Sequence, residues 1–293
     1  MLVLKIIIFQ WNIRTLLICI FGVKINSGRS RKSKVKFMKL LRKIANTNIG
    51  ITFRNFCGIK PVPLNSAYLG ENFSISDGFF WRTDSDFTTN FRFSDLLKIF
   101  YKKKESNVEV FFYDRNHIFL KKINLLNIEY SNNIIIDPNF LGGIRDYGIF
   151  YIYHKMEGKL KSSIRNSCYT GFSYKNQLES YVHGNCPTTY RAFSDNKNSH
   201  IVNDIVGVSI FQNQKYKLQK FFNNFTKVEI FIHNPVSKKI KFKVNNLSFV
   251  LNGKCSIIVD VSHLKEIELI SNCYFLRPLV FNYKNNFIDV HHG

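Results

Sequence analysis

Residues 107–114, NVEVFFYD, form a short run of β-branched and aromatic side chains that ends in a turn residue, Asp114. A run of this length and composition is typical of a β-strand. The next run, HIFLKKINL at 117–125, has the same character and follows after two residues. The two runs predict strands separated by a turn, and this pattern recurs along the chain.

Seven further runs repeat the pattern, bounded by Asn, Asp, Gly and Pro; they are 132–140, 147–154, 227–234, 238–246, 247–253, 255–261 and 266–271. Two segments have helical spacing instead: about 95–103, where Ser94 can cap the helix, and 215–225. Because strands arrive at short spacing with few helices between them, we expect a mainly β protein. The predicted fold is two antiparallel β-sandwich domains, jelly-roll or Ig-like, with a few short helices.

Two pairs of segments indicate an internal duplication. Val108–Phe111 (VEVF) corresponds to Val228–Phe231 (VEIF), and Ile135–Asp137 corresponds to Ile258–Asp260. The alternative is that strands of an AT-rich genome look alike by composition alone. The residues leave both explanations open.

The predicted domain organisation has four parts: a basic N-terminal segment at 1–62, a first β-sandwich at 63–154, an inter-domain segment at 155–205 and a second β-sandwich at 206–293. The inter-domain segment is rich in Ser, Asn, Lys and Tyr. Long connections are usually functional or disordered, and its tyrosines argue against disorder. We therefore expect it to fold over the junction of the two sandwiches.

The formal net charge of the chain is +22, but much of it is concentrated at one end. Residues 1–62 carry thirteen Lys and Arg and no acid, whereas the rest of the chain carries 29 basic and 20 acidic residues. Scattered lysines of this kind are typical of a solvated surface. The charge therefore does not predict a nucleic-acid-binding protein.

The N-terminal residues contain two apolar runs, 1–9 and 15–23, interrupted by Arg14 and followed by a basic cluster. The favoured interpretation is an extension upstream of a start at Met38. The alternative is membrane association through residues 1–23, in which case the basic flank would keep the body on the cytoplasmic side. The predicted location is cytoplasmic, at the inner face of the membrane if that alternative holds.

Six cysteines are present, with no CxxC pair, and two pairs share a spacing of eighteen: Cys168/Cys186 and Cys255/Cys273. Each pair would be a disulfide candidate in a secreted protein. Without an export signal, free thiols are favoured. No Cys or His spacing fits a zinc site, so neither a metal nor a cofactor is expected.

The densest group of functional side chains in the first block is FFWRTDSDF, at 79–87. Trp81 offers a flat face for a sugar ring, while Arg82 and Asp84 can bind hydroxyls or anions. The structural alternative is that Trp81 is a core residue and Arg82 pairs with an acid. A turn at 142–148, GGIRDYG, adds Arg145 and Asp146.

A second group lies in and beside CYTGFSYKNQLESYVHGN, at 168–185. A cation, phenols, an imidazole and an amide are offered by Arg165, Tyr169, Tyr174, His183 and Asn185. Aromatic side chains with polar tips suit a ligand site at a domain junction. We expect this stretch to form a site together with Trp81 and Arg82; the alternative is that its tyrosines only hold the domains together.

FFWRTDSDFTTNFRF, RDYGIFYIYH, CYTGFSYKNQLESYVHGN and CYFLRPLVF with DVHHG together resemble a group of uncharacterised bacterial proteins associated with surface-polysaccharide gene clusters. The resemblance covers about residues 70–293 and implies cell-envelope glycan biology, but no catalytic role. With no reaction motif in the sequence, the expected function is an auxiliary or carbohydrate-binding protein of polysaccharide biosynthesis. Its ligand would be a carbohydrate or a sugar nucleotide. The alternative is a glycan-active enzyme that pairs His183 with Asp84 or Asp146.

Overall fold

The computed structural model describes residues 73–102, 107–155, 164–165, 168–184, 187–192, 199–208, 213–218, 225–273 and 276–293. All of them belong to one compact unit, Asn55–Gly293. The described part contains twenty strands and one short helix, α6 (Leu96–Tyr101), so the protein is mainly β, as the sequence predicts. The interpretations of residues 1–62 lie outside the described residues.

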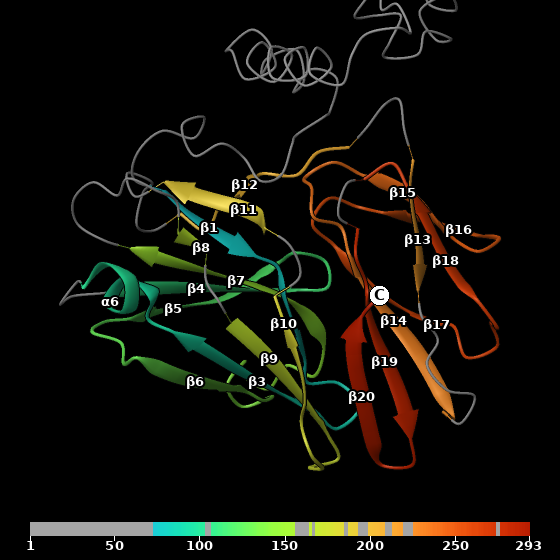
Figure 1. The fold of residues 1–293 in the computed structure, drawn as a ribbon, viewed down its shortest axis with the longest axis horizontal. Coiled ribbons are helices and arrows are strands. Elements are labelled where there is room, and N and C mark those ends of the chain that lie inside the picture. Colours follow the sequence, from blue (N-terminus) through green and yellow to red (C-terminus); the bar gives the residue numbers. More distant parts are fainter. Residues whose placement is uncertain are drawn as a thin grey trace, which may run out of the picture. The chain divides into compact units, whose positions relative to one another are not determined.

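The strands form five four-stranded sheets, which are the blades of a five-bladed β-propeller (Figure 1). We name the blades A to E and give the strands of each in hydrogen-bonded order. Blade A contains β12 (Asn203–Asp204), β11 (Pro187–Ala192), β1 (Phe73–Asp77) and β8 (Ile164–Arg165). Blade B contains β2 (Phe79–Arg82), β7 (Tyr147–Lys155), β4 (Asn107–Asp114) and β5 (Phe119–Leu125). Blade C contains β10 (Ser180–His183), β9 (Cys168–Tyr174), β3 (Phe87–Ser94) and β6 (Ser131–Ile136).

The other two blades come from the C-terminal part of the chain. Blade D contains β17 (Ser256–Asp260), β14 (Lys227–His233), β19 (Leu279–Lys284) and β20 (Phe287–His292). Blade E contains β13 (Gln214–Leu218), β18 (Ile267–Ser271), β15 (Ile240–Val244) and β16 (Leu247–Leu251). Paired strands run antiparallel, except that β8 is parallel to β1.

Separate apolar clusters fill the seams between neighbouring blades. Blades B and C share a cluster that includes Phe79, Phe91, Phe112 and Phe150. Blades C and D share another, with Phe87, Phe172, Phe231 and Phe281. Blades D and E share a third, with Ile230, Ile232, Phe242 and Leu269. Because each cluster joins two sheets, the seams hold the propeller together.

Polar contacts complete the remaining seams. Between blades A and B, the hydroxyls of Tyr153 and Thr189 lie 2.7 Å apart. Between blade A and the turns that connect blades D and E, the Asp204 carboxylate accepts a hydrogen bond from the Ser237 amide at 2.8 Å. It also pairs with the Lys254 ammonium at 2.7 Å. Buried charges are retained where such partners are present.

The prediction of two β-sandwich domains is wrong. A sandwich strand buries one face and leaves the other to solvent, whereas β7 is buried on both. Phe150 and Ile152 face the seam with blade C, while Tyr151 and Tyr153 lie in a cluster on the opposite face. The run YGIFYIYH is apolar at almost every position for this reason, and that continuity is typical of a strand covered on both sides.

The segment 155–205 is interleaved with the first block in its described part. β9 pairs with β3, and β11 pairs with β1, so strands from this segment lie inside blades A and C. The segment therefore supplies sheet strands as well as connections.

The strand predictions agree with the structure to within a few residues, but the helices need correction. Helix α6 is capped by Asp95, whose carboxylate accepts hydrogen bonds from the amides of Leu97 and Lys98, and not by Ser94. The helix predicted at 215–225 is wrong in its described part, because Gln214–Leu218 is strand β13, paired with β18. Cys255 is a free thiol, so the Cys255/Cys273 disulfide candidate is not formed.

Candidate functional site

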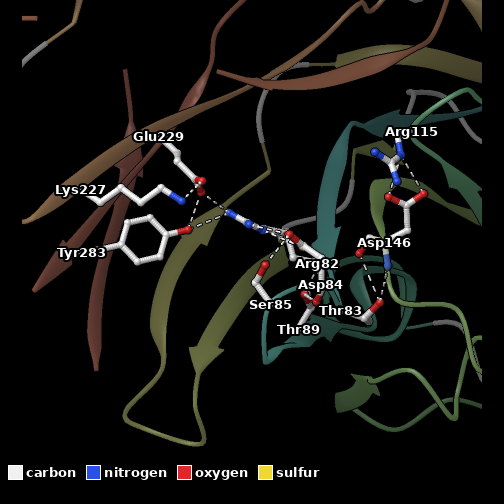
Figure 2. A network of polar contacts seen from close by, with 10 residues as sticks. All are labelled: Arg82, Thr83, Asp84, Ser85, Thr89, Arg115, Asp146, Lys227, Glu229 and Tyr283. Atoms are coloured by element: carbon white, nitrogen blue, oxygen red, sulfur yellow. Dashed lines mark hydrogen bonds and ion pairs between the residues drawn. The ribbon is translucent and has the colours of Figure 1, made fainter. Parts of the chain in front are cut away.

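Arg82, at the end of β2, is the centre of a buried polar network that joins blade B to blade D (Figure 2). Its Nε and Nη2 donate to the Asp84 carboxylate at 2.9 and 2.8 Å. Its Nη1 donates to Glu229 Oε2 at 2.9 Å and to the Tyr283 hydroxyl at 3.0 Å. Lys227 completes the network through an ion pair with Glu229 at 2.6 Å. The network therefore holds two cations and two carboxylates.

The network fixes the charges of its members. Burial opposes the charge on the guanidinium, but the hydrogen bonds to Asp84 and the neighbouring charges outweigh it and raise the pKa of Arg82. Burial alone would raise the pKa of Glu229, but the charge of Arg82 and the hydrogen bonds from Lys227 and Tyr283 lower it. The guanidinium also lies 4.0 Å from the centre of the Phe87 ring. Arg82 is thus bound on all sides by protein, as the structural alternative for it proposed.

Trp81 is a core residue and not a stacking surface. The indole has no exposed surface, and its N–H donates to the backbone oxygen of Tyr113 at 2.9 Å. It also packs over Gly148, where an added Cβ would lie 2.9 Å from the ring. A sugar ring therefore has no access to the Trp81 face that the sequence suggested as a platform.

The three candidate segments converge on one surface cavity, which we call the turn pocket. It has a volume of about 380 Å³. Residues 79–87 give Thr83, Asp86 and Phe87, residues 142–148 give Arg145, and residues 168–185 give Lys175 and Asn176. Thr88 and Pro138 complete the lining. Of the side chains singled out from the sequence, Arg145 lines this cavity, whereas Trp81, Arg82, Asp84, Tyr169, Tyr174 and His183 do not.

Two turns with left-handed backbone form the rim of the turn pocket. Ser85 and Asp86 have φ of 48° and 65°, and Lys175 and Asn176 have φ of 49° and 57°. The Lys175 amide donates to the Asp86 carbonyl at 3.0 Å and ties the two turns together. Consecutive left-handed residues are typical of tight turns, in which short polar side chains are favoured. The rim is therefore polar and held by backbone contacts.

The charges on the turn pocket are only partly balanced. Asp84 is engaged by Arg82, and Asp146 by Arg115 at 2.8 Å. Within the described ranges, neither Arg145 nor Lys175 has a carboxylate partner; the Lys175 ammonium donates to the Asn286 side chain at 3.3 Å. The pocket thus presents two cations against one acid, Asp86.

The other candidates are dispersed. Tyr174 is half-buried beside the pocket, with its ring 5.1 Å from that of Phe87. Tyr169 and His183 are exposed and pair with each other at the opposite end of β9 and β10 from the turn. The backbone of Arg165 lies in β8 of blade A, and Asn185 lies outside the described residues. The His183 ring lies 4.4 Å from that of His292.

A second cavity, the histidine pocket, was not predicted. It has a volume of about 330 Å³ and is lined by Tyr113, His117, His200, Ile201, Val202, Ser237, Gly253 and Lys254. These residues come from turns and strand ends in different parts of the chain. The stretches that supply them are short and far apart in the sequence, and a single histidine in a turn carries no signal of a site.

Local hydrogen bonds position His117 in this pocket. The Asp114 carboxylate accepts from the amides of Asn116 and Ile118, which closes the turn after β4. His117 stacks on the Tyr113 ring, with the ring centres 4.2 Å apart. Burial, and then the charge of Lys254, lower the pKa of His117 to about 4. Its Nε2 is buried and has no hydrogen-bond partner among the described residues, a state that costs about 1–3 kcal/mol.

Comparisons with known proteins assign no family to this chain. No protein-family model, no curated protein and no solved structure matches this chain. In the described ranges, no group of three His, Cys, Asp or Glu side chains is arranged to hold a metal ion. The same ranges hold no helix with the length and apolarity required to cross a bilayer.

Proposed function

We propose that the protein is a non-catalytic carbohydrate-binding protein, and that its turn pocket binds a glycan bearing carboxylate groups. The observation that carries the proposal is the convergence of three separate segments on one polar cavity. The resemblance to proteins of surface-polysaccharide gene clusters makes a bacterial surface glycan the favoured ligand, and an auxiliary part in its biosynthesis follows from that.

The side chains of the turn pocket suit a sugar. Thr88 and Asn176 supply a hydroxyl and an amide group, and Asp86 supplies a carboxylate acceptor. Pro138 offers an apolar surface for the C–H face of a ring. Arg145 and Lys175 add two cations without carboxylate partners in the described part, which favours an acidic glycan.

The geometry of the acids supports binding more than catalysis. Asp84 and Asp146 are each held in an ion pair with an arginine. His183 lies at the opposite end of β10 from the turn pocket, against His292. The pairing of His183 with either acid, which the enzyme alternative needs, is therefore not formed in the described structure.

The test is a binding measurement with a trimer of galacturonic acid and the same trimer as its methyl ester. We expect the acid to bind at low salt and the ester to bind about 10-fold more weakly, because the ester lacks the charges that Arg145 and Lys175 attract. The double substitution Arg145→Ala, Lys175→Ala should abolish the preference for the acid, whereas Lys241→Ala, an exposed lysine of β15, should keep it. Equal binding of acid and ester by the wild type would reject the proposal.

A further inference from the structure

The histidine pocket brings three parts of the propeller together. Tyr113 and His117 belong to the end of β4 and its turn, and His200 precedes β12 of blade A. Ser237 and Lys254 lie in turns that connect blades D and E. The cavity is thus lined by turns and strand ends from different parts of the propeller and shares no lining residue with the turn pocket.

The backbone around the histidine pocket is held in unusual conformations. His117 and Lys254 have φ of 61° and 60°, in the left-handed region that non-glycine residues seldom adopt. At Gly253, an added Cβ would lie 2.1 Å from the Ser237 carbonyl oxygen. The two segments of the chain therefore approach each other at a distance that only glycine allows. Such conformations belong to tight turns and persist where the surrounding structure holds them.

Most donors in the histidine pocket are already used by the protein. The Tyr113 hydroxyl donates to the backbone oxygen of His200. The Ser237 hydroxyl donates to Asp204 at 3.1 Å. The Lys254 ammonium is bound by Asp204 and donates to the Pro235 carbonyl, each at 2.7 Å. By contrast, the buried His117 Nε2 has no partner among the described residues.

The charge balance of the pocket favours a neutral ligand. Lys254 and Asp204 neutralise each other, and the lowered pKa of His117 leaves its imidazole uncharged near neutral pH. Ile201 and Val202 provide an apolar wall. A buried acceptor beside an apolar wall suits a molecule that has both hydroxyl donors and C–H faces.

We propose that the histidine pocket is a second binding site, which takes a neutral polyol of monosaccharide size and in which His117 Nε2 accepts a hydrogen bond from a ligand hydroxyl. The site is independent of the acidic glycan in the turn pocket. Charge plays little part in it, so binding persists at high salt, where an interaction with Arg145 and Lys175 is screened.

The test is ligand-observed NMR on the full chain in about 0.5 M NaCl, with methyl glucoside, myo-inositol and tetrahydropyran as probes. Tetrahydropyran has the ring of a sugar without its hydroxyls. We expect saturable binding of at least one of the two polyols and no displacement by tetrahydropyran. His117→Phe, which keeps an aromatic ring beside Tyr113 but removes the acceptor, should weaken polyol binding about 10-fold or more.

The matched control is Arg145→Ala, Lys175→Ala, which should leave polyol binding unchanged. Loss of polyol binding in this double variant would overturn the proposal, because the polyol would then lie in the turn pocket. Absence of polyol binding to the wild type, or unchanged binding in His117→Phe, would also overturn it. If His117→Phe does not fold, the imidazole ¹⁵N chemical shifts of the wild-type protein are measured with and without saturating polyol. The shift change at His117 should exceed that at His183. Equal changes at the two histidines would reject the site.

Discussion

At the scale of single residues, burial decides which of the conspicuous side chains can meet a ligand. Trp81 and Arg82 stand out in the sequence because their chemistry suits sugars and anions. The structure uses the same chemistry internally, with the indole N–H on a backbone oxygen and the guanidinium between two carboxylates. Lys175 and Asn176, which line the turn pocket, carry no comparable signal because any exposed turn favours them.

The first prediction concerns Arg82. Arg82→Ala should lower the free energy of unfolding by about 3–5 kcal/mol, because it leaves the buried Glu229 without its main counter-charge. Urea denaturation measures the change. The double variant Arg82→Ala, Glu229→Gln should recover part of the loss, since it removes the unpaired charge. A loss of less than about 1 kcal/mol from Arg82→Ala would show that the network is not a structural tie.

A second prediction concerns pH and His233, which is buried between the Tyr151 hydroxyl at 3.2 Å and the Ser256 hydroxyl at 3.1 Å. Burial, followed by the charges of Lys254 and His117, holds the pKa of His233 well below 6.5. Below about pH 6.5, His233 is therefore protonated in the unfolded chain but stays neutral in the folded protein. The free energy of unfolding thus falls as the pH falls.

The expected slope from this one histidine is about 1.4 kcal/mol per pH unit. His233→Gln should reduce the slope of the unfolding free energy against pH by about that amount between pH 6 and 5. Above pH 7 the substitution should leave this slope unchanged. Unfolding curves collected across this range provide the measurement. An identical slope in the variant would mean that the imidazole is accessible to protons in the folded protein.

At the scale of elements, local pattern was a good guide for the runs that were predicted as strands, although it did not identify the hairpins β9–β10 and β19–β20. β4, β7 and β14 begin and end within a residue or so of the runs that predicted them. The exception is β13, whose residues Lys215–Leu218 also fit a helix. Pairing with β18 determines its conformation, and the local spacing of β13 carries no information about a partner strand about fifty residues away.

Helix α6 gives a prediction at this scale. Asp95→Ala should destabilise the protein by about 1 kcal/mol, because the carboxylate caps the amides of Leu97 and Lys98. Ser94→Ala is the matched control and should change the unfolding free energy by less than about 0.5 kcal/mol. Thermal or urea denaturation of the two variants distinguishes the caps, and a larger effect at Ser94 would restore the assignment made from the sequence.

At the scale of the whole molecule, the arrangement of sheets depends on pairings between distant segments. β1 pairs with β11, about a hundred residues away in the sequence. β3 pairs with β9, about eighty residues away. Periodicity shows which faces are apolar but not which sheet covers them, so the mainly β class could be predicted and the propeller could not. The histidine pocket was missed for the same reason, since Asp204 and Lys254 meet only when blade A reaches the turns of blades D and E.

The seams give a prediction about fragments. A fragment of residues 206–293 should not fold into a stable monomer, because Phe231, Leu279 and Phe281 lose the cover of blade C. Exposed apolar surface of this kind promotes aggregation. Size-exclusion chromatography and circular dichroism of the fragment provide the measurement. A soluble monomer with cooperative unfolding would show that blades D and E are an independent domain.

Ion pairs between different parts of the propeller also constrain which substitutions related sequences can tolerate. Arg82 meets Glu229, Arg191 lies 3.5 Å from Glu109, and Lys254 meets Asp204, each pair joining segments far apart in the chain. Loss of one buried partner leaves the other charge without a counter-charge. A substitution that is tolerated at one position therefore favours a compensating substitution at the other. Positions 82 and 229 should therefore vary together among related sequences, and so should positions 204 and 254. Such pairs would report the order of the blades from sequence variation alone.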